Sequence, residues 1–315
     1  MLTKIMEHMN STIATEVSSL QDERKPGKPV DVPRSLQTRI LFTSSPVCLF
    51  GLLLNLLIIW LYCCKIKKTK LTLYFLNMAI ADLIIIFLNV TIIIAYFTPL
   101  NPSLKVRRIL QILHVCAFDT TFFFKATISV ERYIFLKWPF WYNHYRPNNF
   151  SVIISISLWG LSCVVSFVTY YGCYPRFDVS VNTLLNNCRA ANAIEIIIEL
   201  IIFLPSMIIC TFALWIRMQT PVSRLDVSIV GLVLICLIIN APVRITQITS
   251  SWDYNVDRYV LGKISLLLDS VDSASNPIVF LIVGCKKNQK AILFLETALD
   301  EGNTTEKTQS SEVYA

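Results

Sequence analysis

The sequence predicts an all-α bundle of seven membrane-spanning helices, followed by a short amphipathic helix on the cytoplasmic side. Of its 315 residues, 54% are hydrophobic and only 16% are charged, and the mean hydropathy is +0.58. An ordinary soluble domain has a larger share of charged residues. A helix needs about 20 apolar residues to cross a hydrocarbon core about 30 Å thick. The composition therefore favours a multi-pass membrane protein.

The apolar residues fall into seven runs that are each long enough to span a bilayer. The runs lie near residues 40–63, 71–97, 108–136, 150–172, 192–217, 226–249 and 260–283. Prolines interrupt the last three of them, at Pro205, Pro242 and Pro277. Because proline lacks a backbone N–H, we expect irregular helix geometry at these three positions.

The two ends of the chain are polar and differ from the middle. Residues 1–38 carry mixed charges without the apolar core of a signal peptide, so we expect a disordered extracellular tail. Residues 39–284 form the predicted bundle, residues 285–297 the amphipathic cytoplasmic helix, and residues 298–315 a disordered cytoplasmic tail.

Lysine placement predicts the orientation in the membrane. Lysines crowd residues 65–70 and 286–290, which fall on one side of a seven-span bundle, and cytoplasmic loops are enriched in lysine and arginine. We therefore expect a plasma-membrane protein with its amino terminus outside, where the sequon at Asn10 becomes a glycosylation site. The net charge of +7 is explained by this orientation, and we expect no nucleic-acid partner.

Ionisable residues are retained inside the predicted spans. Each costs a few kcal/mol in hydrocarbon, so such residues usually face the bundle interior or one another. The second span contains Asp82, the third His114, Asp119 and Lys125, the fifth Glu195 and Glu199, the sixth Arg244, and the seventh Asp269 and Asp272.

Two polar groupings follow from these positions. Asn55, Asp82 and Asn276 can form a polar knot between the first, second and seventh helices, with either a structural or a switching role. Asp82 with Asp272, Ser273 and Asn276 also supplies clustered oxygen ligands. Because a small hard cation binds such oxygens, an allosteric sodium ion is the one cofactor that we expect.

Short motifs in the spans resemble those of the rhodopsin-like (class A) G-protein-coupled receptors over residues 40–295. The motifs, in order, are GLLLN with Asn55, LNMAIAD with Asp82, ERY at 131–133, Trp159, Pro205, Pro242, and NPIVF at 276–280. SVERYIFLKWPFWYNHYRP, the short inner loop before PVSRLDV, and SNPIVFLIVG resemble more narrowly the Mas-related receptors. The resemblance implies an extracellular ligand and a heterotrimeric G protein as partners.

The resemblance also assigns a switch at the cytoplasmic side of the bundle. Its residues would be Glu131, Arg132, Tyr133, Asn276, Pro277 and Phe280. We expect Glu131 to hold Arg132 in the resting state, and Arg132 to turn toward a partner or the sixth helix on activation.

Several positions depart from the family pattern. Asn240 replaces a common tryptophan of the sixth span, and Phe280 replaces a tyrosine, so the switch is expected to be weaker. This leaves open an orphan or decoy receptor with weak coupling. Thr169 and Asn192 replace acidic residues of the cation-sensing members, so the resemblance does not carry over their ligand preference.

The resemblance implies a disulfide between Cys173 and Cys188, which joins the fourth and fifth spans outside the membrane. Arg107 occupies the place where most relatives of the wider class have the cysteine of a different disulfide. Of the ten cysteines, only Cys173 and Cys188 lie in a predicted outer loop, where the compartment is oxidising, and this supports the pairing.

The predicted ligand pocket lies in the outer half of the bundle. Its candidates are His114, Asp119, Glu195, Glu199, Arg244 and Asp269. If Asp119 pairs with Arg244, an acidic rim formed by the glutamates and Asp269 favours a cationic peptide or amine. If Arg244 and His114 have no such partner, an anionic ligand fits. We favour the cationic ligand.

Two other classes of membrane protein would explain part of the pattern. A transporter also has charged residues and broken helices in the membrane, but it normally has internal repeats and more spans than seven. An enzyme needs a catalytic constellation, and three histidines without an HExxH motif or a glycine-rich phosphate loop do not form one. We therefore expect a receptor and no enzymatic activity.

Overall fold

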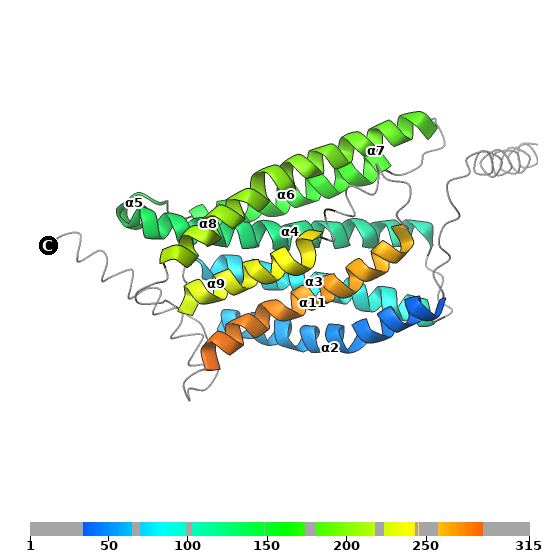
Figure 1. Cartoon of the computed structure of the whole chain (residues 1–315), viewed down its shortest axis with the longest axis horizontal. Coiled ribbons are helices and arrows are strands. Elements are labelled where there is room, and N and C mark those ends of the chain that lie inside the picture. The colour runs from blue at the N-terminus through cyan, green and yellow to red at the C-terminus, as the bar shows by residue number, and fades with distance from the viewer. Residues whose placement is uncertain are drawn as a thin grey trace, which may run out of the picture.

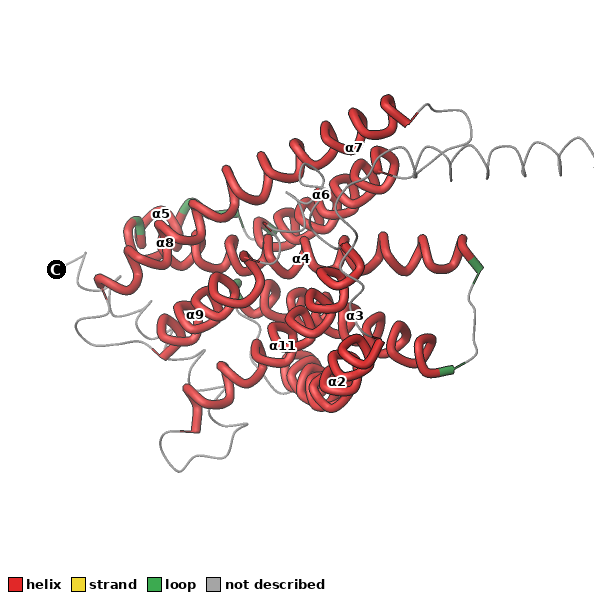
Figure 2. The backbone as a smooth tube through the Cα atoms, turned by 45° about the vertical axis from the view of Figure 1, so that its right-hand side comes forward, coloured by secondary structure: helices red, strands yellow, loops and turns green. Residues whose placement is uncertain are grey.

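The described part of the computed structural model is a bundle of helices. It covers residues 34–64, 70–98, 103–147, 149–173, 181–217, 224–242, 245 and 258–285. Figure 2 shows helices joined by short loops and turns, with no strand in these ranges. The predicted all-α fold is therefore confirmed. Asn10, residues 1–33 and 298–315 of the predicted tails, and residues 286–297 of the predicted amphipathic helix lie outside the described residues. Residues 34–38, which were expected in the disordered tail, are helical instead, because the first helix extends beyond the apolar run.

The long helices run side by side along the long axis of the molecule (Figure 1). The described helices, long and short, are in chain order α2 Arg34–Cys64, α3 Thr72–Phe97, α4 Leu104–Lys137, α5 Pro139–His144, α6 Phe150–Cys173, α7 Val181–Ile196, the π-helix η1 Ile197–Phe203, α8 Leu204–Arg217, α9 Arg224–Ile235, the π-helix η2 Cys236–Asn240 and α11 Arg258–Cys285. The central helix is α4, which packs against α3, α6, α8 and α9.

Five helical segments are long and apolar enough to cross a membrane. They are Thr38–Cys64, Thr72–Phe97, Val106–Lys137, Phe150–Cys173 and Asn186–Arg217. Leu225–Asn240 is a shorter apolar helix, and it covers part of the sixth predicted run. The seventh run lies within α11, whose 28 residues include charged positions.

The polarity of the bundle is inverted relative to a soluble protein. Large apolar side chains such as Ile156 and Ile209 are exposed, whereas Asp82, Lys125 and Arg132 are buried. Apolar side chains are favoured against lipid, and charged groups are retained only where protein surrounds them. The exposed apolar surface is therefore the lipid-facing surface.

Two of the three predicted proline irregularities coincide with π-helical turns. The π-helix η1 ends two residues before Pro205, and η2 ends two residues before Pro242. A proline cannot donate to the carbonyl one turn earlier, so the preceding turn widens to a different hydrogen-bond pattern. Helix α11 continues through Pro277 as an α-helix.

Gly51 of the GLLLN motif permits close packing at the centre of the bundle. A Cβ at this position would lie 2.9 Å from Ile86 Cδ1 and 3.0 Å from Ala274 Cβ. Such contacts are too short for a side chain, so glycine lets α2 approach both α3 and α11. A second link fixes α6 on α3, where Trp159 Nε1 donates to Asn77 Oδ1 at 3.1 Å.

The predicted disulfide between Cys173 and Cys188 is present, and it joins the end of α6 to α7. Its two cysteines are 15 residues apart, and closing a loop of that length stabilises the folded state by about 3 kcal/mol. The other cysteines that the structure describes are free thiols, among them the exposed Cys63.

We predict that Cys173→Ser destabilises the purified protein by about 3 kcal/mol, because the segment between the two cysteines regains its entropy in the unfolded state. Thermal unfolding followed by a thiol-reactive dye would measure this loss, with Cys63→Ser as the control at a free, exposed cysteine. Equal unfolding temperatures for both variants would contradict the prediction.

Candidate functional site

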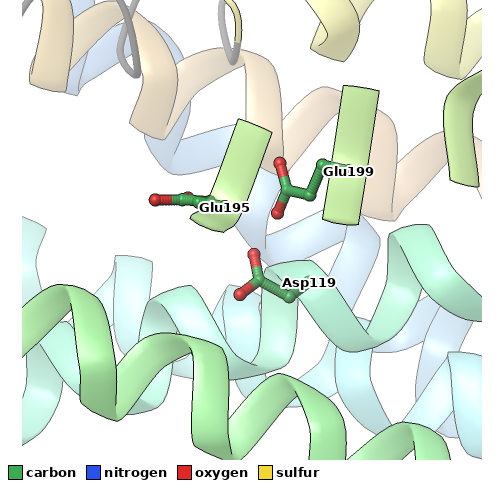
Figure 3. A group of neighbouring side chains, drawn as sticks. All are labelled: Asp119, Glu195 and Glu199. Atoms are coloured by element: carbon green, nitrogen blue, oxygen red, sulfur yellow. The ribbon is translucent and has the colours of Figure 1, made fainter. Parts of the chain in front are cut away.

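Three carboxylates meet inside the bundle (Figure 3). Asp119 comes from α4, Glu195 from α7 and Glu199 from η1, and their oxygens lie within 4.8 Å of one another. Glu195 and Glu199 share one helix face because they are four residues apart. Carboxylate oxygens in this arrangement can bind a hard metal cation or an ammonium or guanidinium group. We call these three residues the acidic cluster.

Both glutamates, which the sequence predicts near the rim of the pocket, are buried among the helices. Glu195 is 3% exposed and Glu199 is 1% exposed. Both turn toward α4 and away from solvent, because the helix that carries them packs its polar face against the interior rather than lipid.

Two hydroxyl groups of α6 support the acidic cluster. Ser166 Oγ donates to Asp119 Oδ2 at 3.5 Å, and Thr169 Oγ1 donates to Glu195 Oε2 at 3.3 Å. These donors orient the carboxylates but bring no positive charge. Arg244, the predicted partner of Asp119, lies outside the described residues.

His114 and Asp269 belong to a second network between α3, α4 and α11. His114 Nε2 lies 3.0 Å from Asn89 Oδ1 and 3.8 Å from Asp269 Oδ2. Ser265 Oγ donates to Asp269 at 3.0 Å, and Asn89 Nδ2 donates to Ser270 Oγ at 2.9 Å. The structure thus places His114 beside a carboxylate. The sequence analysis did not identify Asn89 as a member of this network.

The predicted polar knot is assembled around α11. Asn276 Nδ2 donates to Asp82 Oδ2 at 2.7 Å, and Asn55 Nδ2 donates to the Ser273 carbonyl at 3.0 Å. The first, second and seventh spans are therefore joined by hydrogen bonds. Thr121 Oγ1 of α4 also donates to Asp82, at 3.2 Å, which the sequence analysis missed.

A buried ion pair adjoins this knot. Lys125 Nζ of α4 lies 2.6 Å from Asp272 Oδ2 of α11, and each residue is 2% exposed. The sequence analysis recognised Lys125 as an ionisable residue of the third span but assigned it no partner. The spacing in the sequence does indicate that Lys125 and Thr121, four residues apart, lie on the same face of the third span.

The C-terminal part of α4 carries two separate ion pairs. Arg132 Nε lies 2.5 Å from Asp226 Oδ1 of α9. Glu131 Oε1 instead lies 2.6 Å from Arg146, which follows α5, and accepts a hydrogen bond from Tyr142 Oη at 2.7 Å. The expected pairing of Glu131 with Arg132 is therefore wrong.

Helix geometry explains this correction. Successive residues of an α-helix point about 100° apart, so the side chains of Glu131 and Arg132 leave α4 in different directions. Tyr133 accepts a hydrogen bond from Lys137 at 3.1 Å on the exposed side of the helix. The side chain of Phe280 lies outside the described residues, and Pro277 is buried in α11.

The acidic cluster, a buried polar core and the pair between Arg132 and Asp226 thus lie along one central helix of the bundle. The family model described as 7 transmembrane receptor (rhodopsin family) matches residues 54–280. The chain therefore belongs to the rhodopsin family of seven-transmembrane receptors. It is a multi-pass membrane receptor and not an enzyme.

Within that family the chain is similar to Mas and the Mas-related receptors, as its motifs predicted. It is 26% identical to "Proto-oncogene Mas" of Homo sapiens over 259 residues, which are 80% of this chain and 78% of that protein. It is 27% identical to "Mas-related G-protein coupled receptor member X1" of Homo sapiens over 276 residues, 83% of each chain. It is 26% identical to "Mas-related G-protein coupled receptor member D" of Mus musculus over 290 residues, 87% of this chain and 89% of that one.

Proposed function

We propose that this receptor binds a cationic peptide or amine in the outer half of its bundle and activates heterotrimeric G proteins. The observation that carries the proposal is the acidic cluster of Asp119, Glu195 and Glu199, whose oxygens lie within 4.8 Å of one another. Buried carboxylates repel each other and lose hydration. Carboxylates gathered in this way attract a positively charged group of a ligand and repel an anionic one.

The surroundings of His114 support the same ligand charge. An anionic ligand would need positive charge from His114 or Arg244. His114 already lies beside the carboxylate of Asp269 and the side chain of Asn89. A ligand carboxylate there would face the charge of Asp269, so the cationic ligand is favoured.

The central helix offers a route from the pocket to the cytoplasm. Asp119, Lys125 and Arg132 all belong to α4, and each contacts a different neighbouring element. A ligand that binds one arrangement of the helices more tightly shifts the population toward it. Separation of α9 from α4 would break the pair between Arg132 and Asp226 and expose Arg132 to a G protein.

The orientation predicted from the lysines belongs to this proposal. It places the amino terminus and Asn10 outside the cell and the pair between Arg132 and Asp226 on the cytoplasmic side. The position of the disulfide at the opposite end of α6 from the Arg146 segment is consistent with this, since disulfides persist in oxidising compartments.

Neutralising the acidic cluster tests the ligand charge. We expect Asp119→Asn and Glu199→Gln each to weaken activation by a cationic agonist about 10- to 100-fold in concentration, since charge-assisted hydrogen bonds contribute about 1.5–3 kcal/mol. A panel of basic peptides and amines would be screened by nucleotide exchange on added G proteins. Asp300→Asn, which makes the same change of charge near the carboxyl terminus, is the control.

Three results would count against the proposal. Unchanged potency of the cationic agonist in both variants would remove the acidic cluster from the site. Activation by anionic compounds alone would favour the alternative ligand class. No activation by any compound at normal surface expression, with Arg132→Ala indistinguishable from wild type, would favour the decoy receptor.

A further inference from the structure

The sodium ion predicted from the sequence must fit among Asp82, Asp272, Ser273 and Asn276. Lys125 Nζ already lies 2.6 Å from Asp272 Oδ2, within this set of ligands. The adjacent space, which Thr121, Lys125, Asp272 and Ser273 help to line, has no room for a water molecule. Asp272 Oδ1, Ser273 Oγ and Asn276 Oδ1 are buried without a hydrogen-bond partner among the described residues, so these oxygens are available to a cation, and the cation that the structure places against Asp272 is the ammonium of Lys125.

We propose that Lys125 is a tethered cation that takes the place of sodium in this receptor, joining α4 to α11 and making the resting bundle insensitive to sodium. This inference goes beyond the proposed function, because it needs neither the ligand nor the G protein. It replaces the expected cofactor with a residue of the chain itself.

Repulsion between cations disfavours a sodium ion beside the lysine. Asp272 receives the ammonium directly, and the neighbouring Asp82 accepts from Asn276 at 2.7 Å and from Thr121 at 3.2 Å. A sodium ion bound between the two carboxylates would lie within a few ångströms of the ammonium. Like charges at that separation repel strongly inside a protein, where the dielectric constant is low.

Covalent attachment to the chain also gives the ammonium of Lys125 a higher effective concentration at Asp272 than a free sodium ion has. A group attached to the same molecule competes at an effective concentration set by its attachment, whereas a free ion must be drawn from solution. Lys125 is 2% exposed, so it is held in place by the packing of α4. Sodium could enter only if the ammonium left Asp272.

The ion pair also connects the core to the cytoplasmic side. Lys125 lies seven residues, or about two helical turns, before Arg132 on the same face of α4. Movement of α11 away from α4 would break the pair between Lys125 and Asp272. Unlike a bound ion, the lysine cannot dissociate from the receptor, so the connection depends on helix position alone and not on the sodium concentration.

Sodium binding to the purified, full-length receptor tests the inference without ligand or G protein. We expect the wild-type unfolding temperature to be the same in sodium chloride and in choline chloride of equal ionic strength, and the ²³Na resonance to show no specific broadening. In Lys125→Met the two carboxylates lose their cation. This variant should gain specific ²³Na broadening and a stabilisation by sodium of about 2–4 °C, as for an ion present at several times its dissociation constant.

Two controls make the result specific. Lys137→Met removes an exposed lysine from the end of the same helix and should gain no response to sodium. The double variant Lys125→Met with Asp82→Asn should lose the response that Lys125→Met gains.

Either of two outcomes would overturn the inference. The first is a sodium-selective response of the wild type that Asp82→Asn abolishes. The second is a folded Lys125→Met receptor that binds no sodium. If Lys125→Met does not fold, the wild-type ²³Na titration alone decides, because specific broadening there contradicts a filled cation position.

Discussion

Asp226→Asn is expected to raise ligand-independent G-protein activation about 10-fold or more. Arg132 Nε lies 2.5 Å from Asp226 Oδ1, and both residues are buried between α4 and α9. A hydrogen bond between charged groups contributes about 1.5–3 kcal/mol, and each 1.4 kcal/mol is a tenfold change in an equilibrium. Because activation is proposed to separate these helices, the lost stabilisation falls mainly on the resting arrangement.

Basal nucleotide exchange at matched surface expression measures this effect. Asp226→Glu keeps the charge and should remain closer to wild type than Asp226→Asn. The double variant with Arg132→Ala separates a shifted equilibrium from a general loosening of the bundle, since it should lose the gain in basal activity. Basal exchange equal to wild type in Asp226→Asn would show that this pair does not restrain the receptor.

Lys125→Met is expected to lower the apparent unfolding temperature of the receptor by about 10 °C in sodium-free buffer. The substitution leaves Asp82 and Asp272 buried without the ammonium, and breaking a buried pair costs about 3–5 kcal/mol. Each kcal/mol lowers the unfolding temperature of a protein of this size by about 2–4 °C. Thermal unfolding of purified receptor measures the change.

A substitution of Asp272, the partner of Lys125, supplies a matched control. Replacing both members of a buried ion pair by apolar residues is often close to neutral. The double variant Lys125→Met with Asp272→Leu should therefore recover most of the lost stability. A Lys125→Met receptor as stable as wild type would mean that the two carboxylates do not need the ammonium.

Much of the architecture could be predicted from the sequence. Apolar runs show where spans lie because bilayer thickness sets the number of residues that a crossing helix needs. Pro205 and Pro242 marked the places where the helices change to π geometry. The disulfide between Cys173 and Cys188 and the resemblance to Mas-related receptors also came from local signals and are confirmed.

The positions of the charged site residues could be predicted, but several of their contacts could not. Asp119, Glu195 and Glu199 were all identified as pocket candidates, yet their meeting as a buried cluster required the facing surfaces of α4 and η1. The two glutamates were expected at the rim because sequence position gives depth along a span. It does not give the direction in which a side chain leaves the helix.

The sequence by itself determined most of the helices, the membrane class and many of the buried charges, although it did not single out Asp226 or Arg146. The tertiary structure decided which charges meet, pairing Lys125 with Asp272 across 147 residues and Arg132 with Asp226 across 94. The physical reason is that bilayer thickness and proline act on each segment locally. An ion pair instead depends on the rotation and relative height of two helices, which the packing of the whole bundle sets.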